Sequence, residues 1–423
     1  MVHQNQTLGL QPTFGFGDRL GMATPGHLDA LIAEGGPIKG IFAQQSIREM
    51  NRTNRSPDQV MSAAADALKR EQYVGPWGSD ADHLKSEQDV DDTADAGFMF
   101  YTIDPSDHVD QQADNYDGPT LEKKFQAVRS QLDWIDQYQA QKIQITDGPI
   151  LRFDEATVKR AAVKYGSAIN HARTLAAHIR HAAAKRQRDH EIELSVDETE
   201  QPTTLAEHYI IADQCLKAQM NLVSLAPRYL GDFEKAVDYK GDLDKLGRSL
   251  NDHAAIARHL GPYKLSLHSG SDKLSMYRLF AHTTRGLCHV KTAGTSYLEA
   301  LRVVARHDTS LFRRIIDFAR QRYDRDKATY HVSAVVDRLA PPFEIEDTRE
   351  LERLYLDSWS DVPEGQGFRK PGRQILHCTF GSVLTDQVLY GALSSVLEAE
   401  PETYRQVLAE HFVKHLAGLR SGM

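Results

Sequence analysis

Three short apolar segments of the sequence each end on side chains that bind metal ions or carry protons. The first ends on Asp197 and Glu198, the second on His268 and the third on His377. Carboxylates and imidazoles at the carboxyl ends of strands are what a parallel β/α barrel uses to hold a metal at one rim. Two imidazoles and a carboxylate suit Zn²⁺, Mn²⁺, Fe²⁺ or Ni²⁺. The sequence therefore predicts a divalent metal ion on Glu198, His268 and His377, with Asp197 as the alternative carboxylate ligand.

The alternation of apolar and polar residues in the first segment predicts which side chains face the barrel interior. Successive side chains of a strand point to opposite faces, so the apolar residues should face the helices while Glu193, Ser195 and Asp197 point inward. By the same rule His268 points inward. Polar residues on this face cost free energy unless they serve a site. The alternative role for the carboxylates that end this segment is to cap the helix that follows.

A lysine and a glycine-serine loop extend this set of predicted rim residues. Lys291 points inward near the end of another strand, where a lysine binds a carboxylate, stabilises an enolate or forms a Schiff base. Its alternative role is an ion pair with a rim acid. The loop after the second segment carries Ser271, Asp272 and Lys273. Because free backbone N–H groups in such a loop attract anions, we expect these three residues to contact a substrate.

Two glycines near the N-terminus, Gly15 and Gly17, precede Asp18 and Arg19. A dinucleotide-binding GxGxxG motif would need a third glycine at position 20, where the sequence has Leu20. We therefore predict no dinucleotide site here and expect Arg19, with Asp18 beside it, to bind a substrate carboxylate.

Two further acidic clusters have different expected environments. Asp104 closes another strand-like segment and is a candidate for proton transfer at the rim. Asp80, Asp82 and His83 begin a strongly acidic stretch, for which a solvated surface is the expected environment.

The composition bounds the class of protein. The chain has 423 residues with a net charge of −9 and a pI near 6.1, which argues against nucleic acid as a partner. No segment reaches the roughly 18 apolar residues that span a bilayer, and the N-terminus lacks the pattern of a signal peptide. The three scattered cysteines are typical of reduced core residues in a cytoplasmic protein. Barrel enzymes of this size often self-associate, so a homo-oligomer is an open alternative.

Strand-like segments alternate with helical ones along the chain, which predicts an α/β fold, a TIM-like (β/α)8 barrel. Nine segments compete for eight places: Phe14–Asp18, Ile41–Ser46, Tyr73–Trp77, Phe98–Asp104, Glu191–Asp197, Leu222–Ala226, Lys264–His268, Cys288–Thr292 and Gln374–Thr379. The extra strand is expected to be Tyr73–Trp77, which is broken by Gly75 and Pro76, or Gln374–Thr379, which follows a long C-terminal excursion.

Two long connections are expected to be helical insertions or appendages of a single barrel domain, 1–423, with a C-terminal extension. Residues 105–190 contain a predicted hairpin, Lys142–Phe153, and then one long helical stretch, Asp154–His190. Residues 307–373 carry a predicted helix, Leu311–Asp324, and a loop rich in proline, glycine and charge. We expect both connections to cover the rim that carries the site.

Several sequence blocks together resemble the tagaturonate/fructuronate epimerase family. They are Phe14–Gly21, Thr24–His27, Trp77–Lys85, Ser195–Thr199, His268–Lys273, Lys291–Ser296, and His377 with Thr379–Leu384. These blocks run through nearly the whole chain. The resemblance implies an isomerase of hexuronate breakdown that interconverts D-tagaturonate and D-fructuronate with a divalent metal. Related members act on the neutral ketohexoses tagatose and fructose, so the preferred sugar stays open.

The chemistry implied by this resemblance constrains the mechanism. The inverted carbon lies β to the ketone, so the carbonyl does not acidify its C–H bond. Transient oxidation would need NAD, and the sequence shows no dinucleotide-binding motif. We therefore favour retro-aldol cleavage followed by re-addition to the other face. A Lewis acid and a proton carrier serve this reaction. Asp104 or Lys291 would carry the proton, with Asp197 as a further catalytic candidate, and Arg19 or Lys273 would hold the carboxylate.

Three alternatives share part of this expected site. A class II-type aldolase would release three-carbon fragments, and a metal-dependent ketose isomerase would move a proton α to the carbonyl. A non-catalytic sugar-binding protein would need neither inward carboxylates nor a metal.

Overall fold

A closed barrel of eight parallel strands forms the centre of the computed structural model, which describes residues 5–269 and 272–423. The strands follow the order β1-β10-β9-β8-β7-β4-β3-β2 around the barrel. Their bounds are β1 (Thr13–Gly17), β2 (Lys39–Ser46), β3 (Trp77–Leu84), β4 (Phe100–Ile103), β7 (Glu191–Ser195), β8 (Leu222–Ala226), β9 (Lys264–Leu267) and β10 (Cys288–Thr292). The predicted TIM-like barrel is confirmed.

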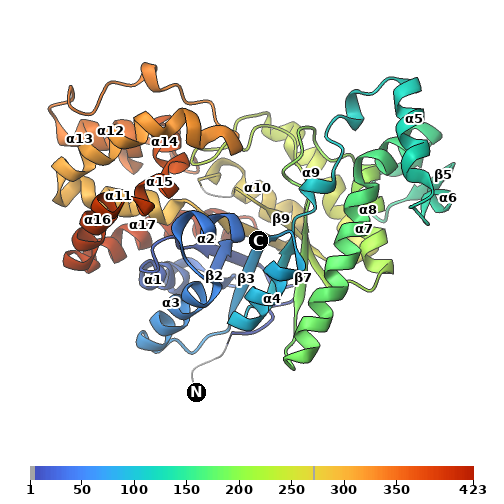
Figure 1. The fold of residues 1–423 in the computed structure, drawn as a ribbon, viewed down its shortest axis with the longest axis horizontal. Helices are drawn as coiled ribbons and strands as arrows, with labels where there is room; N and C mark the ends of the chain where they lie inside the picture. The colour runs from blue at the N-terminus through green and yellow to red at the C-terminus, as the bar shows by residue number, and fades with distance from the viewer. Residues whose placement is uncertain (1–4, 270–271) are drawn as a thin grey trace.

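Helices cover the outside of this barrel (Figure 1). Those between the strands are α1 (Thr24–Glu34), α2 (Ile47–Thr53), α3 (Pro57–Arg70), α4 (Glu87–Ala96), α8 (Leu205–Lys217), α9 (Leu243–Leu260) and α10 (Leu274–Thr284), and α11 (Thr295–His307) follows the last strand. Local sequence fixes several of their starts. Ser56 and Gln59 form a reciprocal capping box at α3, and Thr204 and Glu207 form another at α8.

The connection between β4 and β7 folds into a separate group of elements beside the barrel, drawn in teal and green in Figure 1. It contains α5 (Gly118–Arg129), α6 (Ile135–Tyr138), the antiparallel hairpin β5 (Gln141–Gln144) and β6 (Ile150–Phe153), and α7 (Glu155–Lys185). The predicted hairpin and long helix are both present. Between α5 and α6 the helix is broken, and Leu132 and Trp134 in the break are buried.

Six α-helices follow the last barrel strand and its helix, and Figure 1 shows them in orange and red on the other side of the barrel. They are α12 (Thr309–Asp326), α13 (Thr348–Leu356), α14 (Gly372–Cys378), α15 (Phe380–Thr385), α16 (Gln387–Ala399) and α17 (Pro401–Arg420). The last of these packs against α1, α10 and α11. No helix in the described part of the chain is both long and apolar enough to cross a membrane.

Two predicted strands are wrong. Gln374–Thr379 lies mostly in helix α14, because an apolar run of a few residues cannot distinguish a strand from a buried helix. Tyr73–Trp77 is a turn region that ends where β3 begins. The third barrel strand was missed because two of its buried positions, Asp80 and Asp82, are charged, whereas the prediction looked for apolar runs.

Candidate active site

A pocket opens at the carboxyl ends of the barrel strands, as the barrel fold predicts. Its walls come from the ends of strands β2, β3 and β10, from the loops that follow β1, β7, β8, β9 and β10, and from segments α2, α14 and 327–331. The lining residues are Arg19, Gln44, Ser46, Arg48, Glu49, Asp82, His83, Asp197, Glu198, Lys235, Ala236, His268, Ser269, Lys291, Ala293, Tyr330 and His377.

The predicted inward direction of Lys291 is confirmed, because its ammonium lies among three carboxylates inside the barrel. Its Nζ atom is 2.7 Å from Asp80 Oδ2, 2.8 Å from Asp82 Oδ1 and 3.0 Å from Glu193 Oε1. Burial alone would lower the pKa of this lysine, but the carboxylates raise it well above its usual value. A lysine held as the ammonium is not a nucleophile, so this geometry matches the ion-pair interpretation rather than a Schiff base.

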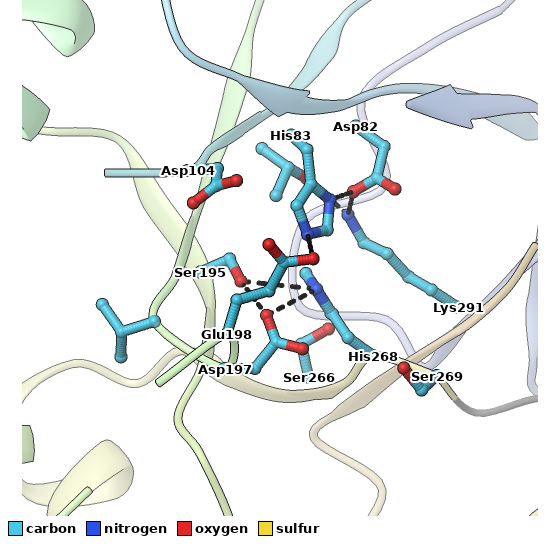
Figure 2. A network of polar contacts seen from close by, with 12 residues as sticks. Asp82, His83, Asp104, Ser195, Asp197, Glu198, Ser266, His268, Ser269 and Lys291 are labelled. Carbon is cyan, nitrogen blue, oxygen red and sulfur yellow. Dashed lines mark hydrogen bonds and ion pairs between the residues drawn. The ribbon is translucent and has the colours of Figure 1, made fainter. Parts of the chain in front are cut away.

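His268 also points inward and contacts acids through both ring nitrogens. Its Nε2 atom lies 2.6 Å from Glu193 Oε1, and its Nδ1 atom lies 3.2 Å from Asp197 Oδ1. Burial would lower the pKa of this imidazole, but Asp197 and Glu193 raise it to about 10. Asp197 in turn accepts a hydrogen bond from Ser195 Oγ. The contact between His268 and Asp197 therefore joins the end of β9 to the end of β7 (Figure 2).

His83 occupies the centre of the site, although the sequence predicted a solvated surface for it. Its Nδ1 atom lies 2.7 Å from Asp82 Oδ1, and its Nε2 atom points toward Glu198, 3.8 Å from Oε1 (Figure 2). The residue has a left-handed backbone with φ of 56°, at an irregularity in the pairing of β3 with β4. A positive φ is uncommon for residues other than glycine, and strand irregularities of this kind re-aim side chains at barrel rims.

Two groups of side chains around His83 could hold a metal ion. Asp82, His83 and His268 form one group, and His83, Asp104 and Glu198 form the other, with the ligand atoms of each group within 4.8 Å of one another. The Oδ2 atom of Asp104 is buried without a hydrogen-bond partner among the described residues, although Lys85 Nζ lies 3.7 Å away, so it keeps the capacity to accept from a cation. Imidazole nitrogens and carboxylate oxygens suit a divalent transition metal, so the residues fit such an ion.

The predicted ligand His377 lies in another environment. It extends from helix α14 into the same pocket, but among the described residues it belongs to no metal-capable group. Burial first, and then the charges of Arg19 and Lys235, lower its pKa well below the usual value. Its Nδ1 atom has no hydrogen-bond partner in the described chain. The structure thus places a neutral imidazole near cationic side chains, and its role as a metal ligand stays a prediction.

Besides Lys291, the arginine and lysine residues in the pocket lining are Arg19, Arg48 and Lys235. Arg19 bonds Glu49 with an Nε–Oε1 distance of 2.8 Å, and its guanidinium stacks 3.5 Å over the ring of Phe380. Arg48 Nη2 lies 2.9 Å from Glu198 Oε1, and Lys235 donates to Ser269 Oγ. The sequence pattern gave no signal for Arg48 and Lys235, because they come from a helix and a loop without a strand-end motif.

Apart from Arg19, the described residues that were predicted to bind substrate make hydrogen bonds and ion pairs within the protein. Asp18 accepts hydrogen bonds from the backbone of the loop after β1, with the N–H groups of residues 20, 21 and 23. Lys273 donates to the carbonyls of Glu234, at 2.7 Å, and Val237. Asp18 and Lys273 are not in the pocket lining and make these structural contacts, so their predicted role in substrate binding stays a prediction. Ser271 lies outside the described residues.

Asp272 belongs to a buried ionic network on the far side of this loop. Its Oδ2 atom lies 2.8 Å from Arg373 Nη2, and its Oδ1 atom lies 3.0 Å from His411 Nε2. The Nδ1 atom of the same histidine lies 3.3 Å from Glu299 Oε1. Asp272, His411 and His415 also meet the distance criterion for a metal group. However, Asp272 Oδ2 already accepts from Arg373, and His415 Nε2 already accepts from the backbone N–H of Asp272.

Comparison with known proteins agrees with the fold and shows the family. A sequence model described as tagaturonate epimerase matches residues 3–419. A tagaturonate/fructuronate epimerase of Thermotoga maritima is 38% identical over 96% of this chain and 80% of its own length. Two crystal structures of a fructuronate-tagaturonate epimerase from Cohnella laeviribosi, one native and one with glycerol, superpose with a TM-score of 0.89. They have 34% and 35% identity, and cover 98% of this chain and 83% of theirs. The chain therefore belongs to the tagaturonate epimerase family, a group of carbohydrate epimerases within the isomerases.

Proposed function

We propose that this protein interconverts D-tagaturonate and D-fructuronate with the help of a divalent metal ion. The observation that carries the proposal is one pocket in which a metal-capable cluster around His83 adjoins the cations Arg48 and Lys235. A hexuronate substrate has a ketone and hydroxyl groups that a metal binds, and a carboxylate that a cation binds. The family and the relatives in Thermotoga maritima and Cohnella laeviribosi support the same substrate pair.

The metal would be held by His83 and His268, with carboxylates from Asp82, Asp104 or Glu198. This set keeps two of the ligands predicted from the sequence and puts His83 in the place of His377. When bound there, a divalent cation supplies Lewis-acid polarisation of the substrate's ketone.

The chain's own acids would move the hydroxyl proton. In the retro-aldol step, the hydroxyl on the inverted carbon loses its proton, the adjacent carbon–carbon bond breaks, and an aldehyde and an enediolate form. Rotation of the aldehyde exposes its other face, and the reverse step restores the bond and the proton. Asp197 lines the pocket and is oriented by Ser195 and His268, so we assign it this proton, with Asp104 as the alternative.

The carboxylate of the substrate would bind to Arg48 and Lys235 rather than to Lys273. Arg48 is partly exposed on the pocket wall, and Lys235 lies in the loop after β8. Arg19 is less available, because Glu49 already neutralises it, although its Nη1 atom has no hydrogen-bond partner in the described residues. A neutral ketohexose would leave Lys235 without an anionic partner, because among the described residues this lysine bonds Ser269 rather than an acid. We therefore favour the uronate.

The test is NMR of the purified protein with D-tagaturonate and Mn²⁺, Ni²⁺ or Zn²⁺ in D₂O. We expect D-fructuronate without deuterium on the inverted carbon, and loss of turnover after chelation. Full activity of a metal-free sample would contradict the metal requirement. Three-carbon fragments would identify an aldolase, deuterium α to the carbonyl would identify a ketose isomerase, and turnover of tagatose alone would identify a ketohexose epimerase.

A further inference from the structure

Two loop segments of the rim are joined through one buried side chain, Gln374 on helix α14. Its Nε2 atom donates to Glu234 Oε2 at 2.6 Å. Its Oε1 atom accepts hydrogen bonds from the backbone N–H groups of Ser333, at 3.2 Å, and Ala334, at 2.8 Å. The side chain is 1% exposed and is absent from the pocket lining, so Gln374 does not contact a substrate.

Additional contacts make this junction a multi-point connection between the two segments. Glu234 Oε2 also accepts from Ser333 Oγ at 2.8 Å and from Lys240 Nζ at 2.7 Å. The backbone N–H of Lys235 donates to the carbonyl of His331 at 3.3 Å. Both segments lack regular strand or α-helix over these residues, so side-chain hydrogen bonds rather than a ladder fix their relative position.

Each of the two joined segments places one side chain in the pocket. Lys235 is the residue next to Glu234, and Tyr330 lies three residues before Ser333. Helix α14 itself contributes His377, which is one turn beyond Gln374. The ring of Tyr330 lies 5.8 Å from the imidazole of His377, measured between centroids. Helix α14 therefore holds together three parts of this side of the pocket: the segment with Lys235, the segment with Tyr330, and its own His377.

We propose that Gln374 is a positioning residue that sets the place of Lys235 and Tyr330 around the substrate carboxylate. This assignment rests on the proposed function. Because the carboxylate is bound equally in the ground state and the transition state, loss of its positioning weakens substrate binding without slowing the chemical step. The effect therefore falls on KM for the uronate, and kcat changes little.

The test compares Gln374→Leu with a matched buried variant, Gln214→Leu. Gln214 donates to Tyr138 at 2.6 Å, away from the pocket, and controls for loss of a buried glutamine hydrogen bond. We expect Gln374→Leu to raise KM for D-tagaturonate about tenfold, the scale of one lost buried hydrogen bond, with kcat within about threefold. Gln214→Leu should leave KM unchanged. An unchanged KM in Gln374→Leu, or a fall in kcat alone, would overturn the proposal.

A double-mutant cycle tests whether the rise in KM caused by Gln374→Leu depends on Lys235. In a Lys235→Met background, Gln374→Leu should raise KM much less than in the wild type, because the positioned group is already gone. Equal effects in both backgrounds would contradict the assignment.

Hydrogen exchange separates the junction from the proposed substrate. Amides in residues 229–240 and 327–335 should exchange faster in Gln374→Leu than in Gln214→Leu, whether or not the uronate is turned over. Unchanged exchange would reject the junction itself. Faster exchange in a protein whose wild type does not convert the uronate would uphold the junction and reject the proposed function.

Discussion

Two buried clusters of acids, imidazoles and cations lie on either side of the β9 loop, and they differ in charge balance. In the sealed cluster, Asp272 pairs with Arg373, and Glu299 pairs with Arg302, with His411 between the two acids. In the cluster at the rim, acids outnumber cations. Asp80, Asp82, Glu193, Asp197 and Glu198 surround Lys291 and two histidines, with Arg48 at the edge.

This difference distinguishes a structural network from a site. A balanced network of buried charges satisfies itself and gains nothing from another ion. A surplus of carboxylates in a low-dielectric pocket is costly until a cation or protons compensate it. The raised pKa of His83, about 9, follows from this surplus, since Asp82 outweighs the burial that would lower it. Residue types alone do not separate the two clusters, but charge balance does.

The largest expected effect is on the sealed cluster. Arg373 is fully buried and bonds Asp272, the carbonyl of Ala236 at 3.0 Å and the carbonyl of Leu356 at 2.6 Å. Arg373→Met should lower the free energy of unfolding by about 3–5 kcal/mol, because it leaves a buried carboxylate without its cation. Urea denaturation measures this change.

The control for that variant is Arg353→Met, which removes an exposed ion pair with Asp361 and should change stability little. Metal content should stay that of the wild type in both variants. If Arg373→Met lost metal while keeping its stability, the sealed cluster would belong to the site and the comparison would fail.

A substitution in the rim cluster should reduce metal binding and activity more than stability. His83→Ala removes the imidazole shared by both metal-capable groups, so we expect loss of bound metal and a fall in kcat/KM of at least about 100-fold. Its melting temperature without metal should change much less than that of Arg373→Met. Metal analysis by mass spectrometry and steady-state kinetics test this, with the exposed His282→Ala as control. Wild-type metal content in His83→Ala would remove this residue from the ligand set.

The barrel itself could be predicted from sequence because most of its strands carry an apolar pattern. The bounds of Leu222–Ala226 and Cys288–Thr292 match β8 and β10. The inward positions of Glu193, His268 and Lys291 followed from alternation alone, and their contacts inside the barrel confirm them.

The missed part of the site has a physical cause in each case. Asp80 and Asp82 were assigned to a solvated surface because charge runs are usually exposed, although their spacing of two residues places them on one face of a strand. His83 lies at the carboxyl end of β3, much as His268 comes directly after β9, and that similarity was the available signal. Arg48 and Lys235 reach the pocket only through tertiary packing, which no local spacing records.

The smallest expected effect concerns Arg48, which with Lys235 forms the cationic side of the pocket facing the acids. Arg48 is 36% exposed at its side chain and pairs with Glu198 at 2.9 Å, so its removal should cost only about 0.2–1 kcal/mol of stability. If Arg48 also binds the substrate carboxylate, Arg48→Gln should raise KM for D-tagaturonate by roughly 3–10-fold, since an exposed pair is screened by water. KM for tagatose, which has no carboxylate, should not rise. An equal rise for both sugars would mean that Arg48 acts by orienting Glu198 at the metal-capable cluster. Arg48 would then belong with the acids, and Lys235 would be left as the cation that binds the substrate carboxylate.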